Sequence, residues 1–190
     1  AGLCAADMGD TVKGSGIRGG IVVHLGCGDG RETAGLLVNE SYVVHGLDTD
    51  GGNVAKAKAH LRSKGLYGAA SVARFDGRTL PYGDNIVNLI VADTLGNVPA
   101  KEAMRVLAPL GAMVVGGKKT VKPWPTDIAD WPQYPNKADN NAVAMDRVAG
   151  PPRLIQWVHN PAWCLPHLGI PTAASLVPRS APVFNPDARA

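Results

Sequence analysis

Residues 21–35 read IVVHLGCGDGRETAG, and this stretch predicts the fold more clearly than any other. Its apolar run IVVHLG is typical of a buried β-strand. Glycines at 26, 28 and 30 follow, and RETAGLLVN (31–39) then predicts a helix. A strand, a glycine-rich turn and a helix in this order are typical of sheets in which helices connect parallel strands.

The same alternation continues to about residue 117. The further elements that the pattern predicts are a strand at 42–48, a helix at 53–65, strands at 71–76 and 85–93, a helix at 98–110 with Pro99 in its first turn, and a strand at 111–117. Strands rich in Val and Ile that alternate with helices indicate a parallel sheet covered on both faces. We therefore expect an α/β fold with a Rossmann-like parallel sheet.

Composition divides the chain into two parts. Residues 1–120 contain 21 of the 23 glycines, whereas residues 121–190 contain 12 of the 15 prolines and all four tryptophans. Proline at this density is incompatible with long helices and central strands. We therefore predict a compact domain over residues 1–120 and an irregular Pro/Trp-rich segment over residues 121–190.

Charge and cysteine content exclude several classes of function. The net charge of +3 is spread along the chain without a basic stripe, which argues against nucleic-acid binding. No apolar run approaches the roughly 20 residues that a membrane helix requires. Cys4, Cys27 and Cys164 are too few and too scattered for a disulfide framework or a zinc site, so no metal is expected. The start of the chain, AGLCAADMGD, shows no signal peptide and fits a mature end left after processing.

The glycine-rich turn is a candidate ligand site. Glycine allows positive φ and close approach of a ligand, and the start of the following helix offers N–H groups to a carboxylate or phosphate. The dinucleotide fingerprint G-x-G-x-x-G requires glycine at position 31, where this chain has Arg31. The observed spacing favours a nucleoside with an amino acid tail and disfavours an NAD-type oxidoreductase. A tight turn without a ligand is the alternative.

Acidic residues end the predicted strands at the same edge of the sheet. Asp48 lies 18 residues after Gly30, where a carboxylate can accept hydrogen bonds from both ribose hydroxyls. Asp76 lies beside Gly77, where it could accept from an adenine amino group. Asp93 follows the fourth strand. Each of these acids could instead be a turn or capping residue.

Four pieces of the sequence resemble class I S-adenosylmethionine (SAM)-dependent methyltransferases. They are HLGCGDG (24–30), HGLDTD (45–50), FDGRTLPYGDNIVNLIVAD (75–93) and EAMRVLAPLGAMVV (102–115). The part from Leu80 to Gly111 looks like the strand-four block of small-molecule methyltransferases. This resemblance covers roughly residues 20–117, and it implies SAM as cofactor, S-adenosylhomocysteine as product and a small molecule as methyl acceptor.

The resemblance also implies a set of cofactor-binding residues. They are His24, Gly26, Cys27, Gly28, Gly30, Asp48, Thr49, Asp76, Gly77 and Asp93. By resemblance the glycines line the methionine part of SAM, Asp48 holds the ribose and Asp76 the adenine end. Asp93 and Thr94 border the place of the methyl acceptor, and Asp93 is the candidate catalytic residue, with a strand-end cap as its alternative role.

Three positions depart from the family pattern. His24 replaces the acid that usually opens the first motif, Asn88 stands where aspartate is common, and Leu110 replaces a usual glycine. The change at His24 removes a carboxylate partner for the methionine ammonium group. A core histidine that donates to a backbone carbonyl is the alternative role for His24. A second hypothesis for the whole domain is a non-catalytic module that binds SAM or a nucleoside.

The second part of the chain resembles a different family. DIADWPQYPNKADNNAVAMDRVAGPPRLIQW (127–157) looks like the opening of PQQ-type β-propeller proteins, and the whole chain resembles bacterial fusions of a methyltransferase-like domain with such a propeller. Only 33 residues follow Trp157, too few for one complete blade. The resemblance leaves the compartment open, because SAM is a cytoplasmic metabolite and such propellers usually work in the periplasm or outside the cell. RLIQWV (153–158) is the candidate for a further strand of the sheet.

Overall fold

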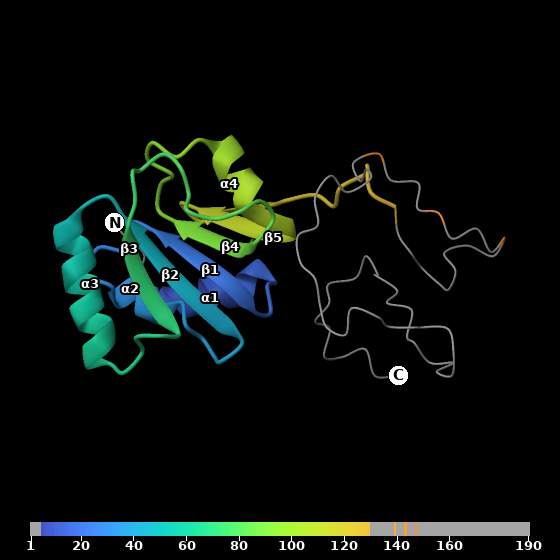
Figure 1. Ribbon diagram of the computed structural model, residues 1–190. Helices are drawn as coiled ribbons and strands as arrows, with labels where there is room; N and C mark the ends of the chain where they lie inside the picture. The colour runs from blue at the N-terminus through green and yellow to red at the C-terminus, as the bar shows by residue number, and fades with distance from the viewer. Residues whose placement is uncertain (1–4, 130–138, 140–142, 144–146, 148–190) are drawn as a thin grey trace, which may run out of the picture. The chain divides into compact units, whose positions relative to one another are not determined.

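The computed structural model describes residues 5–129 together with Asp139, Val143 and Arg147. Contacts within the chain define a compact unit, Ala1–Trp124, which contains the sheet. Its strands have the order β3-β2-β1-β4-β5-β6 (Figure 1). They are β1 (Gly20–Leu25), β2 (Tyr42–Asp48), β3 (Ala70–Arg74), β4 (Val87–Ala92), β5 (Leu107–Val115) and β6 (Lys118–Val121). The first five strands run parallel and β6 is antiparallel to β5, so the predicted α/β fold is confirmed.

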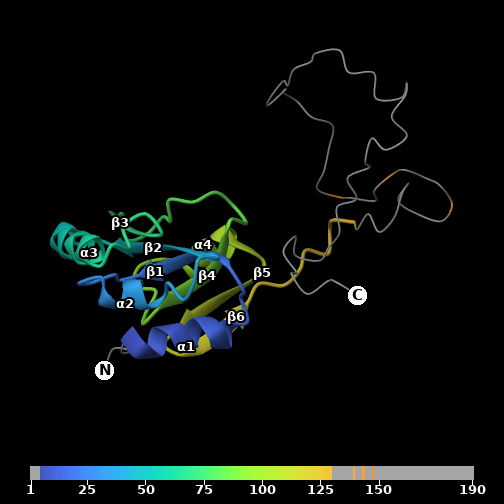
Figure 2. The same ribbon diagram turned by 90° about the horizontal axis from the view of Figure 1, so that it is seen from below.

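Helices cover both faces of this sheet. They are α1 (Ala5–Ser15), α2 (Arg31–Gly35), α3 (Gly51–Ser63) and α4 (Ala100–Val106). Side chains of α1 and α3 and the residues around α2 pack on one face, whereas α4 packs on the other together with the irregular segments around Leu80 and Val98. Figure 2 shows α1 and α4 on opposite sides of the sheet.

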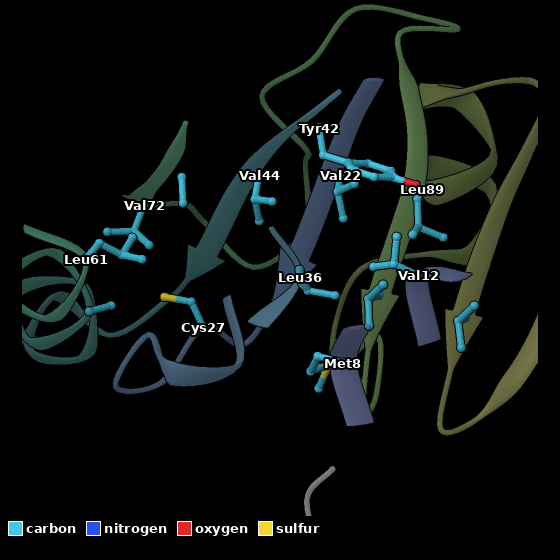
Figure 3. Close-up of a cluster of buried hydrophobic side chains, with 14 of the residues drawn as sticks. Met8, Val12, Val22, Cys27, Leu36, Tyr42, Val44, Leu61, Val72 and Leu89 are labelled. Carbon is cyan, nitrogen blue, oxygen red and sulfur yellow. The ribbon is translucent and has the colours of Figure 1, made fainter. Parts of the chain in front are cut away.

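The core on the α1–α3 face joins three adjacent strands. Val44, Val22 and Leu89 come from β2, β1 and β4 and are fully buried. They pack in one cluster with Met8 and Val12 of α1 (Figure 3). The intervening residues of the same strands point to the α4 face, since successive side chains of a strand alternate. Burial on both faces accounts for the continuous apolar runs of these strands.

Two helices are shorter than their pattern predicts. The helix expected at 31–39 ends at Gly35, a residue that is a poor helix former. The helix expected at 98–110 begins after Pro99, its N-cap, and ends at Val106. Proline at position 109 disfavours helical geometry at the residue before it, and residues 107–110 join β5 instead.

The departures at Asn88 and Leu110 have local structural consequences. The side-chain oxygen of Asn88 accepts a hydrogen bond from the backbone N–H of Ile21 at 2.9 Å, which ties the start of β4 to β1. Leu110 has a φ of 62°, in the left-handed region that favours glycine. The family's usual glycine at this position therefore fits the observed backbone better than leucine does.

Two elements of the fold were missed in the sequence. Helix α1 (Ala5–Ser15) overlaps the stretch at 1–10 that was interpreted as a processed end, although Met8 and Val12 have the i, i+4 spacing of an apolar helix face. Strand β6 follows β5 through Gly116 and Gly117, whose positive φ angles of 54° and 77° suit a two-residue hairpin turn. The strand predicted at 153–158 and nearly all of the Pro/Trp-rich segment lie outside the described residues, so they remain predictions.

No helix in the described part of the chain has the length and apolar character needed to cross a membrane.

Candidate functional site

A cavity of about 350 Å³ opens at the carboxyl ends of the strands. The chain runs from β1 to β2 and β3 on one side and crosses back to β4 on the other, so the strand order switches between β1 and β4. Ligands of open α/β sheets bind at such switch points. The cavity is lined by His24, Leu25, Gly26, Glu32, Asp48, Thr49, Phe75, Gly77, Asp93, Thr94, Leu95, Gly96 and Asn97.

The glycines of the turn after β1 have different roles. Gly26 lines the cavity with a φ of 84°, and a Cβ at this position would meet nothing within 4 Å. Gly30 has a φ of 86°, but a Cβ there would lie 2.8 Å from the Cα of Ala57 in α3. Gly26 therefore offers backbone to a ligand, whereas Gly30 allows α3 to pack closely against the turn. Gly28 and Gly30, both predicted to contact the cofactor, are not among the lining residues.

Asp48 joins the turn to β2 and reaches the cavity. It is buried at the end of β2, and its Oδ2 accepts from the backbone N–H of Gly28 at 3.1 Å and from Nδ2 of Asn53 at 3.2 Å. Its Oδ1 accepts from the N–H of Asp50 at 2.9 Å. A carboxylate offers about four acceptor positions. These three hydrogen bonds leave one position open. The first of the two predicted ribose hydroxyls would use it, and the second would displace one of the three existing hydrogen bonds.

His24 lies on β1 with its imidazole turned toward α2. Its Nδ1 lies 2.9 Å from Oγ1 of Thr33, and its Nε2 lies 3.6 Å from Oε2 of Glu32. Burial lowers the pKa of His24 to about 4, although Asp93 and Asp48 act in the opposite direction. The imidazole is therefore neutral at pH 7. The alternative role of a core histidine predicted a backbone carbonyl as its partner, and the structure instead shows a threonine hydroxyl.

Carboxylates dominate the charge of the cavity. Glu32 lies in the first turn of α2, and its pKa is raised by burial, then by Asp93 and Asp29. Together with Asp48, Glu32 and Asp93 place three carboxylates on the lining, which contains no lysine or arginine. A site with this charge is complementary to a cationic ligand.

Asp76 lies outside the cavity lining. The strand before it ends at Arg74, and Oδ1 of Asp76 accepts from the N–H groups of Arg78 and Thr79 at 2.8 and 2.7 Å. These hydrogen bonds lower its pKa. Asp76 therefore has the turn-capping role that was its alternative. Its neighbours Phe75 and Gly77 line the cavity.

Of the other residues predicted to contact the cofactor, some line the cavity and others lie outside its lining. Thr49 and Asp93, which the resemblance implies as cofactor contacts, line the cavity, and their contact with a cofactor remains a prediction. Cys27 is buried behind the turn, where Gly46 makes room for it, because a Cβ at position 46 would lie 2.8 Å from Cβ of Cys27. Burial, reinforced by Asp48, raises the pKa of the Cys27 thiol to about 11, so it is a packing residue and not a nucleophile.

Glu32, Phe75 and the segment Leu95–Asn97 were missed in the sequence. Phe75 directly precedes Asp76, so its position near a strand end was a usable signal. Glu32 had no such signal, because the direction of its side chain depends on how α2 packs on the sheet. Among the residues that the structure describes, no group of three His, Cys, Asp or Glu side chains could hold a metal ion.

Comparison with known proteins agrees with the fold. Residues 22–114 match a family model described as "Methyltransferase domain". A structure described as a candidate SAM-dependent methyltransferase from Methanococcus maripaludis is 19% identical, with a TM-score of 0.53 over 58% of this chain and 53% of that one. A SAM-dependent methyltransferase from Aquifex aeolicus is 23% identical, with a TM-score of 0.52 over 57% and 62%. No curated protein matches the sequence.

Another similar structure is the [4+2]-cyclase SpnF, which is 26% identical, with a TM-score of 0.51 over 57% of this chain and 43% of that one. The chain thus spans less than two thirds of the length of each of these proteins. The family model and these structures agree with the predicted class I methyltransferase fold. The part of the chain that matches the family model, residues 22–114, is just under half of its length.

Proposed function

We propose that the chain binds SAM in the cavity at the carboxyl ends of the strands and transfers its methyl group to a small-molecule acceptor. The charge of the cavity carries this proposal. SAM has a sulfonium and an ammonium group against one carboxylate, so it is a net cation. Three lining carboxylates without a lysine or arginine attract such a ligand and repel the pyrophosphate of a dinucleotide.

The lining residues fit the parts of SAM. Asp48 is the proposed partner of the ribose hydroxyls, and the backbone at Gly26 is the proposed neighbour of the methionine part. We place the adenine ring beside Phe75, which can stack on it, and beside Gly77. Asp76 lies just outside the lining, and its contact with the adenine amino group remains a prediction.

The chemistry requires mainly positioning. SAM supplies a methyl carbon whose bond to sulfur breaks, with the electron pair staying on sulfur, as the acceptor atom forms its new bond. The protein's part is to align the acceptor and exclude water. Asp93 and Thr94 follow β4 and border the cavity, so we propose that the acceptor lies beside them. Asp93 is the candidate to receive a proton that the acceptor loses.

Methyl transfer is a separate question from binding. The [4+2]-cyclase with this fold is named for a different reaction, and a module that binds SAM without catalysis remains the second hypothesis. The bacterial origin and the attached propeller implied by residues 127–157 also remain predictions.

Binding is tested first, by calorimetry on the complete 190-residue chain with SAM, S-adenosylhomocysteine and NAD. We expect dissociation constants of roughly 1–100 μM for the first two, in the usual range of metabolite affinities. NAD should show no binding at millimolar concentration. Failure of both SAM and S-adenosylhomocysteine to bind at millimolar concentration would overturn the proposal.

Catalysis is tested next, with SAM labelled in the methyl group and a panel of small-molecule acceptors. Transfer of label to an acceptor supports the enzyme. If SAM binds and no acceptor is labelled, the non-catalytic module is supported instead.

A further inference from the structure

The position of the missing acid raises a specific question about the cavity. In the family that this chain resembles, an acid usually opens the first motif, and here His24 occupies that place on β1. His24 is almost completely buried, with 2% of its surface exposed, and it lines the cavity. A neutral imidazole cannot neutralise the ammonium group of a methionine tail. Another group must therefore supply the negative charge.

The contacts of His24 orient it toward Glu32. The Thr33 hydroxyl lies 2.9 Å from Nδ1, and Oε2 of Glu32 lies 3.6 Å from Nε2. When Thr33 donates to Nδ1, the ring proton lies on Nε2 and faces the carboxylate, whereas the other tautomer turns a lone pair toward it. The first arrangement is electrostatically favoured. Because 3.6 Å is too long for a hydrogen bond, the imidazole leaves the charge of Glu32 uncompensated.

Glu32 and Asp93 share this end of the cavity. Glu32 comes from α2 with 31% of its side chain exposed, and Asp93 follows β4 on the other side of β1. Asp93 is close enough to affect both Glu32 and His24 electrostatically. Two like charges in a partly desolvated site repel each other, and a cation between them removes that repulsion. An ammonium group has three N–H donors, so it can bond to both carboxylates.

We propose that Glu32 and Asp93 together bind the α-ammonium group of the methionine part of SAM, so that an acid on α2 replaces the acid missing from β1. The inference rests on the proposed function and names the residues that recognise the amino acid tail. His24, held by Thr33, lies beside Glu32 without forming a hydrogen bond to it.

The test compares two ligands that differ in the amino acid tail. S-adenosylhomocysteine has the tail, whereas 5′-methylthioadenosine keeps the adenosine and the thioether and lacks it. We expect Glu32→Gln to weaken S-adenosylhomocysteine binding about 10- to 100-fold, the usual effect of losing a charge-assisted hydrogen bond. Its affinity for 5′-methylthioadenosine should stay unchanged, which also shows that the cavity is folded. Asp93→Asn should give the same selective loss.

Glu40→Gln is the matched control, because Glu40 is exposed in the turn before β2 and lies outside the cavity lining. It should leave both affinities unchanged. Wild-type affinity of Glu32→Gln for S-adenosylhomocysteine would overturn the inference and leave the proposed function standing. An equal loss of both ligands would also overturn it, because Glu32 would then support the shape of the cavity. Failure of the wild type to bind either ligand would instead refute the proposed function.

Discussion

Two charged clusters of this domain differ in how their charges are matched. In the first, around Arg105, the guanidinium donates to both carboxylate oxygens of Glu102 and pairs with Asp84. It also donates to the backbone carbonyls of Leu80 and Tyr82. In the second, the cavity, Glu32 and Asp93 share the lining with the buried neutral His24, and the lining contains no lysine or arginine.

The pKa values of Glu102 and Glu32 show the consequence of this difference. Hydrogen bonds from Arg105 and from the N–H of Leu80 hold the pKa of Glu102 at about 2, whereas burial and neighbouring acids raise the pKa of Glu32. The matched cluster fastens the connection between β3 and β4 to α4. Carboxylates without a nearby cation repel each other and oppose folding. They are retained where a ligand supplies the positive charge. We therefore expect changes in the first cluster to affect stability and changes in the second to affect binding.

The largest expected effect is the response of the cavity cluster to acid. The pKa of His24 is about 4 in the folded protein and 6.5 in the unfolded chain. Between these values the unfolded chain binds more protons, so the free energy of unfolding decreases as the pH falls, by a total on the order of 3 kcal/mol. Glu102 contributes only at the acidic end of this window, because its stabilisation is lost below the unfolded value of 4.5, and it contributes equally to a wild type and a variant that differ only at His24.

Urea denaturation near pH 7 and near pH 4 measures this effect in the wild type and in His24→Asn. Asparagine keeps a hydrogen-bonding group for Thr33 but does not titrate. The wild type should lose more stability than the variant. Equal losses in the two proteins would contradict a buried neutral imidazole.

Asp48→Asn should have the next largest effect, on ligand binding. The variant loses the charge that we propose holds the ribose, and it disturbs the acceptors for Gly28 and Asn53. We expect the affinities for S-adenosylhomocysteine and 5′-methylthioadenosine to fall together, by about 100-fold, because both ligands contain the ribose. Asp50→Asn is the matched control, since Asp50 is the exposed N-cap of α3 and asparagine caps as well as aspartate. A loss confined to S-adenosylhomocysteine would show that Asp48 binds the tail and not the ribose.

Arg105→Met should have the smallest effect on ligands and a clear effect on stability. The variant leaves Glu102 and the carbonyls of Leu80 and Tyr82 without their shared donor. We expect the thermal unfolding midpoint to fall by several degrees, with unchanged affinity for S-adenosylhomocysteine below that temperature. Lys101→Met, on the exposed side of α4, should change neither quantity. If Arg105→Met weakened binding in the folded protein, the separation between the two clusters would not hold.

Local patterns predicted most of the fold and part of the site. The apolar runs predicted β1 to β5. Of the acids singled out by their strand-end positions, Asp48 and Asp93 are on the cavity lining and Asp76 is not. The C-terminal end of the helix predicted at 98–110 was wrong, because apolar periodicity does not distinguish the last turn of α4 from the start of β5. Strand β6 was missed because four residues, KKTV, carry too little pattern to read.

The sequence by itself determined the order of strands and helices and the acids at their ends, because these follow from periodicity and from the geometry of parallel strands. Only the tertiary structure decided which glycine lines the cavity. Gly26 and Gly30 belong to the same motif. Ala57 of α3 fills the space beside Gly30, whereas the space beside Gly26 is open. Tertiary packing also brought Glu32 to His24 and Asp93, since the direction of a side chain on α2 is set by the contact between the helix and the sheet.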